Sequence, residues 1–412
     1  MREEIMHICI LKYVLMTTFL RITSATFLLI LLSFQSKAQS NDLSDLEFGT
    51  LNNFDIATWN IRFFPANGQT TIDYVVEIIE ELELDVIAIQ EIDDADEFDQ
   101  LLSQLQGYDG FYDDNDFLKL GYIYNIQSVT LNDQYQLYAG SSFGNPFPRR
   151  PLVMELTFMG EHDFVVINNH FKCCGNAVLD ESDFWDEETR RAYASELLKE
   201  HMDTFLPDEN VIMLGDLNDL LIDDEVNNVF QVFFDDPQNY QFVDMDIAEG
   251  SSSQWSFPDW PSHLDHILVS NELFSAIDDE ESQIATIQID DVFPGGFNGY
   301  DNNVSDHLPV AFGFNPDNLT PLSDGSNVFK SNDFKIFPNP SAGVFQVALS
   351  PKFELDQIVV FDQMGRTVEQ FNFGSSSNSI SINLEKLPMG IYSVQLTTQG
   401  SKTATIKLVI AR

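Results

Sequence analysis

Apolar and polar residues follow two different periods along the chain, and each period predicts a different element. The stretch FDIATWNIRFF (54–64) alternates in steps of two, which predicts a β-strand. The stretch TIDYVVEIIEELE (71–83) repeats its apolar residues at helical spacing, and DEETRRAYASELLKEHMDTFL (186–206) predicts a second helix. The apolar runs LDVIAIQEI (84–92), FVVINNHF (164–171) and NVIMLGDLND (210–219) predict buried strands. Strands mixed with amphipathic helices predict an α/β domain.

The pattern changes in the loop-like stretch NPDNLTPLSDGSN (315–327), which is rich in turn-forming residues. Beyond it, short alternating segments are separated by Gly, Pro and Asn, as in all-β sandwiches. We therefore expect an α/β domain over 53–315, a linker over 316–333 and a small all-β sandwich over 334–412.

The N-terminal region has the pattern of a secretory signal. Arg21 precedes an apolar run from Ala25 to Phe34, and small residues follow around Ala38. We assign 1–39 to this leader and the polar stretch 40–52 to a linker. The run is too short for a comfortable membrane span, so we expect no stable span in the mature chain; a membrane anchor is the alternative. Translation could start at Met1 or at Met16.

The chain of 412 residues carries 66 acidic and 20 basic residues, a net charge of -46. Passive binders of polyanions neutralise phosphates with basic patches, so this composition argues against that class. It fits a well-solvated protein that uses divalent cations, and equally an acidic surface suited to saline surroundings.

The three cysteines exclude a disulfide framework. Cys9 falls in the leader, while Cys173 and Cys174 are adjacent. This pair is either two free thiols or a vicinal disulfide, and the spacing does not match a cysteine metal site.

Polar side chains recur beside the ends of the apolar strands, where a rigid backbone presents them at an open rim. Each one alone is readily explained as a cap or turn residue. Together they supply the parts that phosphodiester hydrolysis needs: carboxylates for a hard cation, a base for water and donors for phosphate oxygens. They are Asn60, Glu91, His170, Asp216, Asn218, Asp265, Asp306 and His307.

The blocks TWNIRFF, IAIQEI, VINNHF, MLGDLND, LDHILVS and VSDHLPV, in this order, resemble the endonuclease/exonuclease/phosphatase family. The resemblance implies two packed β-sheets flanked by helices, a four-layered α/β/β/α sandwich. It implies a metal site at Asn60, Glu91 and Asp306 for Mg²⁺, with Mn²⁺ or Ca²⁺ as alternatives. It also implies catalytic roles for five residues: His170, Asp216, Asn218, Asp265 and His307. Of these, Asp265 would orient the imidazole of His307.

NPFPRRPLVMEL resembles a block of the deoxyribonuclease branch, which implies that Arg149 and Arg150 face the phosphate; a solvated turn is the alternative. That branch has a glutamate in place of Arg150. It also has a glutamate that orients the first histidine, whereas this chain has DFLKL there, with Asp116 out of register. We expect Arg190 and Arg191 to make surface contacts, and both histidines to lie outside the core.

The tail resembles the type A C-terminal sorting domain of the type IX secretion system, through its PNP turn, DQMGR, GIY and a final basic strand. The resemblance implies the secretion machinery as a partner and export across the outer membrane. A β-sandwich binding module is the alternative.

The sequence therefore predicts a secreted, divalent-metal-dependent phosphodiesterase, most simply an endonuclease that hydrolyses extracellular DNA. A sphingomyelinase, a phospholipase C-like enzyme and a phosphatase are alternatives on the same scaffold. A catalytically silent surface binding module is an alternative of a different class.

Overall fold

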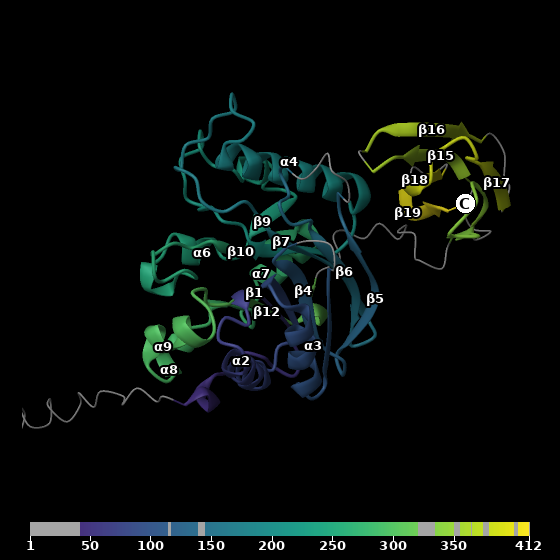
Figure 1. Cartoon of the computed structure of the whole chain (residues 1–412). Coiled ribbons are helices and arrows are strands. Elements are labelled where there is room, and N and C mark those ends of the chain that lie inside the picture. Colours follow the sequence, from purple (N-terminus) through teal and green to yellow (C-terminus); the bar gives the residue numbers. More distant parts are fainter. Residues whose placement is uncertain are drawn as a thin grey trace, which may run out of the picture.

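The computed structural model describes residues 42–113, 117–138, 145–319, 334–349, 355–363, 365–373, 379–398 and 403–411 (Figure 1). The expected leader, Asp116 and most of the expected linker 316–333 lie outside these ranges. No helix in the described part of the chain combines the length and apolar character needed to cross a membrane.

Two six-stranded sheets form the centre of the larger domain. The first sheet, in spatial order, contains β11 (Gln283–Thr286), β12 (Val310–Phe314), β1 (Phe54–Phe64), β2 (Val86–Ile92), β4 (Lys119–Asn125) and β3 (Tyr108–Tyr112). The second contains β5 (Val129–Gln136), β6 (Leu152–Phe158), β7 (His162–His170), β8 (Val211–Asp216), β10 (Asp265–Ser270) and β9 (Tyr240–Phe242). β1 pairs parallel with β2, and β7 with β8, whereas the other described pairs are antiparallel.

An apolar core between the sheets and one on the outer side of each sheet define four layers. The first sheet is covered by η1 (Leu43–Asp45), α2 (Gln69–Leu82), α3 (Ala95–Gln104), α8 (Ile289–Val292) and α9 (Gly296–Asn303). The second is covered by α4 (Glu187–Phe205), α5 (Gln231–Phe234) and α6 (Met245–Ala248). Shorter pieces complete the domain: η3 (Ser252–Gln254), η4 (Asn271–Leu273), α7 (Phe274–Ile277) and η5 (Pro316–Asn318). The predicted α/β/β/α sandwich is confirmed.

Alternating side chains of β1 pack into two different apolar cores. Phe54 and Ile56 pack between the sheets, whereas Trp59 and Ile61 pack under the helices. The strand is therefore buried on both faces along most of its length. In α2 the residues at helical spacing, among them Ile72 and Ile79, are fully buried, as their period predicts.

Residues 42–52, which fall in the expected linker 40–52, pack against the larger domain. Leu43, Leu46 and Phe48 are buried in the core beneath the helices, and the Gly49 amide donates to the carbonyl oxygen of Leu82. Three well-spaced apolar residues are enough to hold this segment against the domain.

The C-terminal region is all-β, as predicted. Its strands are β13 (Phe334–Phe337), β14 (Val344–Leu349), β15 (Leu355–Phe361), β16 (Thr367–Asn372), β17 (Ser379–Asn383), β18 (Gly390–Thr398) and β19 (Thr403–Ile410). They form a three-stranded and a four-stranded sheet around their own core, which includes Phe345, Ile358 and Leu408.

Candidate active site

The two parallel strand pairs bring four predicted site residues to one edge of the sandwich. Asn60 and Glu91 lie near the carboxyl ends of β1 and β2, and His170 and Asp216 end β7 and β8. Asn60 Nδ2 donates to Asp216 Oδ2 at 2.9 Å and lies 3.3 Å from Glu91 Oε1. A hydrogen bond thus joins the two sheets at the centre of the site.

His170 is buried at 2 % exposure, so the expectation that it lies outside the interior is wrong. Its Nε2 lies 3.5 Å from Asp216 Oδ2 and 3.8 Å from Glu91 Oε1. Burial lowers its pKa well below the ordinary value, and the positive charges of Arg149 and His307 lower it further. Its buried Nδ1 has no hydrogen-bond partner among the described residues. Burial and the two nearby positive charges therefore disfavour the charged form of His170.

His307 is also buried, and Asp265 fixes its ring. His307 Nδ1 lies 2.7 Å from Asp265 Oδ2, and Nε2 lies 3.9 Å from Asp216 Oδ2. Phe257 packs against the imidazole with ring centroids 4.8 Å apart. Burial alone would lower the pKa of His307, but attraction to Asp265 and Asp216 outweighs it and raises the pKa to about 10.

The GDLND loop carries Asp216 and Asn218 to this site. Burial raises the pKa of Asp216 to about 7, although His307 opposes the shift. The Asn218 amide N–H donates to Asp216 Oδ1, and Asn218 Nδ2 donates to the Phe171 carbonyl oxygen. Asn218 has a left-handed φ of 55°, a conformation that costs free energy and recurs at functional sites. Gly215 is required here, because a Cβ would lie 2.0 Å from the Asn169 carbonyl oxygen.

Asp306 pairs with Arg62, whose Nε lies 3.5 Å from Asp306 Oδ2. Arg62 also pairs with Asp301. Burial raises the pKa of Asp306, whereas the positive charges of His307 and Arg62 lower it. The sequence did not indicate a role for Arg62, because nothing in β1 signals that its side chain reaches Asp306, far along the chain.

Glu91 and Asp306 carry carboxylates, the ligands that hard divalent cations prefer. Asn60 directs its Nδ2 toward Glu91 and Asp216, and its Oδ1 already accepts from the Arg62 amide. Glu91 has a left-handed φ of 66°, and its Oε2 accepts from the Phe63 amide. A tighter cluster consists of Asp216, Asp265 and His307, with ligand atoms within 4.8 Å of one another. Asp265 and His307 are bonded to each other, so we read that cluster as a hydrogen-bonded set.

The two predicted phosphate-facing arginines are half-buried in the segment before β6. Arg149 is close enough to His170 for its charge to lower the pKa of that imidazole. The structure therefore brings the charge of Arg149 near His170.

The expectation that Arg191 makes surface contacts is wrong, because its side chain is buried. Its Nε donates to Asp219 Oδ2 at 2.7 Å, and its Nη1 donates at 2.7 Å to the carbonyl oxygens of Lys172 and Cys174. Arg191 thus ties the loop after β7 to the loop after β8. Arg191 Nη2 also lies 3.5 Å from Oε1 of the buried Glu188, three residues earlier in α4.

A pair of buried amides also joins the sheets and was not foreseen. Gln90 Nε2 donates to Asn168 Oδ1 at 2.8 Å, and Asn168 Nδ2 donates to the carbonyl oxygens of Ile89 and Gly121. Buried polar groups with satisfied hydrogen bonds fix one relative placement of the two sheets.

The model of the Endonuclease/Exonuclease/phosphatase family matches residues 57–307, and that of the Secretion system C-terminal sorting domain matches residues 335–411. The chain belongs to the endonuclease/exonuclease/phosphatase family. It is accordingly a divalent-metal-dependent phosphoric-ester hydrolase, and its type IX tail marks it for export to the cell surface or beyond.

Several solved structures are similar. TDP2 of D. rerio humanized by 14 mutations shares 16 % identity, covers 64 % of this chain and 99 % of its own, and has a TM-score of 0.48. The human Nocturnin catalytic domain shares 15 %, with 65 % and 96 % covered and a TM-score of 0.45. The endonuclease/exonuclease/phosphatase from Bacteroides vulgatus shares 14 %, with 63 % and 98 % covered and a TM-score of 0.44. No curated protein matches the chain.

Proposed function

We propose that the chain is a secreted endonuclease that hydrolyses extracellular DNA with Mg²⁺. The observation that carries the catalytic part is the convergence of Asn60, Glu91, His170, Asp216 and His307 at one edge of the sandwich. This edge presents carboxylates, an oriented imidazole and neutral donors on rigid strand ends, which is what in-line hydrolysis of a phosphodiester requires.

Glu91, Asp306 and Asn60 would hold the cation. When bound, Mg²⁺ offsets the negative charge that develops on the phosphate and on the leaving oxygen. Mn²⁺ and Ca²⁺ suit the same oxygen ligands, so the preference for Mg²⁺ is part of the proposal.

The chain's own residues orient water and phosphate. Asp216 accepts a hydrogen bond from the attacking water, and Asn218 beside it fixes the direction of attack. Asp265 holds the Nδ1–H of His307, which leaves Nε2 directed toward Asp216 and the reacting group. His307 Nε2–H and His170 donate hydrogen bonds to phosphate oxygens, and His307, whose pKa is raised, supplies a proton to the leaving oxygen.

The net negative charge of the chain means that DNA must be held by contacts close to the site. A protein of net charge -46 repels DNA at long range, so binding depends on few contacts near the site. Arg149 lies close to His170, and Lys172 follows His170 by two residues. Arg150 is the third candidate cation.

A second candidate, a phospholipase C-like or sphingomyelinase activity, is favoured by one observation. Phe257 and Ser262 form a short antiparallel bridge, and Trp260 between them is 78 % exposed. Since Phe257 packs on His307, this turn presents an exposed aromatic side chain near the site, where it suits insertion into a lipid surface as well as stacking on a base.

The purified chain, tested on plasmid DNA, RNA, sphingomyelin vesicles and a phosphomonoester panel, separates these candidates. We expect nicking of plasmid with little sequence preference and millimolar need for divalent cation. Intact plasmid with Mg²⁺, Mn²⁺ and Ca²⁺, together with hydrolysis of sphingomyelin or a phosphomonoester, rejects the nuclease proposal. Loss of sphingomyelin hydrolysis in Trp260→Ala would then support the lipid activity.

We infer that residues 1–39 direct the chain through the Sec pathway, after which the tail engages the type IX machinery. N-terminal sequencing of the exported protein tests this: a first residue near 40 supports a cleaved leader, and an intact start rejects it.

A further inference from the structure

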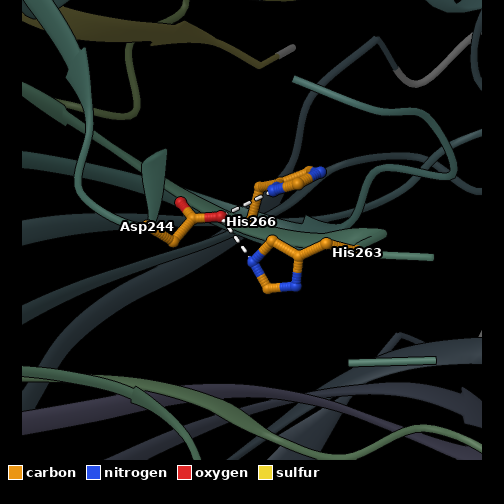
Figure 2. A group of neighbouring side chains, drawn as sticks. All are labelled: Asp244, His263 and His266. Atoms are coloured by element: carbon orange, nitrogen blue, oxygen red, sulfur yellow. Dashed lines mark hydrogen bonds and ion pairs between the residues drawn. The ribbon is translucent and has the colours of Figure 1, made fainter. Parts of the chain in front are cut away.

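A buried carboxylate and two imidazoles form a cluster: Asp244, His263 and His266 (Figure 2). Asp244 follows β9, His266 lies on β10, and His263 lies just before that strand. Asp244 Oδ2 lies 3.0 Å from His263 Nε2 and 2.6 Å from His266 Nδ1. All three side chains are almost fully excluded from solvent.

The partners of these side chains determine where their protons reside. His266 Nδ1 faces the Asp244 carboxylate, and His266 Nε2 faces the Asp219 carbonyl oxygen at 2.9 Å. Both partners accept and neither donates, so both nitrogens of His266 carry a proton and the ring is an imidazolium. His263 differs: its Nδ1 accepts from the Ser256 amide, so its single proton lies on Nε2.

The same three residues have ligand atoms close enough for a metal ion, but their surroundings disfavour one. A metal on His263 Nε2 would move the proton to Nδ1, where it would face the Ser256 N–H. Asp244 Oδ1 already accepts from the Ile267 amide. We therefore read the cluster as an ion pair within a satisfied hydrogen-bond network.

The network reaches the catalytic loop through Asp219. His266 donates to the Asp219 carbonyl oxygen, and Arg191 donates to the Asp219 carboxylate. Two buried cations thus hold the residue that directly follows Asn218. Successive residues of a strand point to opposite faces, so on β10 Asp265 orients His307 while its neighbour His266 holds the loop from the other face.

We propose that His266, charged and held by Asp244, is a positioning residue that fixes the Asp216–Asp219 loop for hydrolysis. This inference rests on the proposed roles of Asp216 and Asn218. Asn218 keeps a left-handed backbone that costs free energy, so its conformation needs such support from its surroundings. Residues that orient catalytic groups from behind typically change activity by about 10–100-fold.

The first test is spectroscopic and independent of any activity. The full chain, labelled with ¹⁵N-histidine, is observed by long-range ¹H–¹⁵N correlation at pH 7 and 8, and His266 is assigned with His266→Gln. We expect two protonated nitrogens on His266 and one on His263. Burial lowers the pKa of His201 to about 4, so His201 serves as the neutral internal standard. A neutral His266, or stoichiometric Zn²⁺ that Asp244→Asn releases, overturns the proposal.

The second test is kinetic and uses bis(p-nitrophenyl) phosphate, so that failure to cleave DNA does not confuse the result. His266→Gln keeps one donor but cannot bridge Asp244 and Asp219. We expect kcat to fall about 10–100-fold with KM within about twofold. Asp244→Asn should likewise lower kcat with little change in KM, and the surface variant His162→Gln should match the wild type in both. Folded fractions at the assay temperature are measured by near-ultraviolet circular dichroism.

Wild-type kcat in a folded His266→Gln or Asp244→Asn protein overturns the positioning role. If one variant does not fold, the other decides, and the protonation state is read on the wild-type protein in either case. Absence of all phosphodiester activity in the wild type, with His266 doubly protonated, contradicts the proposed function and leaves the ion pair standing.

Discussion

His307 and Asp265 are paired at the candidate active site, with 2.7 Å between His307 Nδ1 and Asp265 Oδ2. They are 42 residues apart in the chain and meet where β10 begins. The adjacent Asp306 pairs with Arg62. Two neighbouring ionisable residues before β12 therefore serve different parts of the site.

This contact makes the Asp265–His307 pair a direct target for mutation. We expect His307→Ala, and separately His170→Ala, to lower kcat by about 10²–10⁴, the usual scale for acid-base and anion-stabilising groups. Asp265→Asn should lower kcat as well, because an amide does not fix the imidazole as a carboxylate does. Steady-state hydrolysis of a verified substrate measures the effect. If both histidine variants keep rates near wild type, the assigned site is wrong.

The burial of these groups changes the expectation for stability. The sequence suggested that both histidines could be removed without structural cost, but both are buried. The alanine variants should therefore also unfold at lower denaturant, and the folded fraction must be known before kcat is compared.

Arg149 should matter more for a polymer than for a small ester. Only DNA has flanking phosphates, so we expect Arg149→Ala to weaken plasmid cleavage more than hydrolysis of bis(p-nitrophenyl) phosphate. Few cationic contacts also imply a shallow decline of DNA binding with salt, since the slope scales with the phosphates neutralised. Arg366→Ala in the sorting domain is the control. Equal losses on both substrates would remove Arg149 from the DNA contact.

Asp55 and Asp85 lie at the end of the first sheet opposite the site, and they should make the free energy of unfolding depend on pH. The Asp55 amide donates to Asp85 Oδ2, and Asp55 Oδ1 is buried without a partner among the described residues. Burial raises the pKa of Asp55 to about 7 and that of Asp85 to about 6. A raised carboxyl pKa stabilises the fold at pH below about 4, and this contribution disappears as pH rises through about 7.

Urea unfolding at pH 5 and pH 8 checks this. We expect the wild type to lose more unfolding free energy between these pH values than Asp55→Asn, by a few kcal/mol, because one pKa unit corresponds to about 1.4 kcal/mol. Asp96→Asn, on the exposed side of α3, should behave like the wild type. An identical pH dependence in Asp55→Asn contradicts the raised pKa of Asp55.

The tail should be needed for export and not for hydrolysis. Its strands have a separate core, so a chain ending at Asn332 should fold and hydrolyse substrate like the full chain. In the native host this shortened chain should accumulate inside the cell envelope. Fractionation and immunoblotting measure its location, and equal export with and without the tail would reject a sorting role for it.

Local patterns predicted much of this molecule because strand and helix periods reflect burial directly. The helix α2 and the strands β2, β7 and β8 lie where their apolar residues placed them, and the polar blocks at their ends meet at one edge. What the sequence did not reveal are pairs made across long separations. Arg191 of α4 is buried with Asp219 from the loop after β8 as well as with Glu188 of its own helix, and His266 is charged because Asp244 and Asp219 surround it. No local period encodes such partners.

Metal-dependent phosphodiester hydrolysis at the edge that contains Glu91 is tested most directly by a Mg²⁺ titration of plasmid nicking by wild type and Glu91→Gln. The hard cation needs an ionised oxygen at this position. We predict no nicking by the wild type in chelator, and for Glu91→Gln little activity at low Mg²⁺ with partial recovery at high Mg²⁺. Nicking in chelator by either folded protein, or identical Mg²⁺ titrations for the two, would contradict the account.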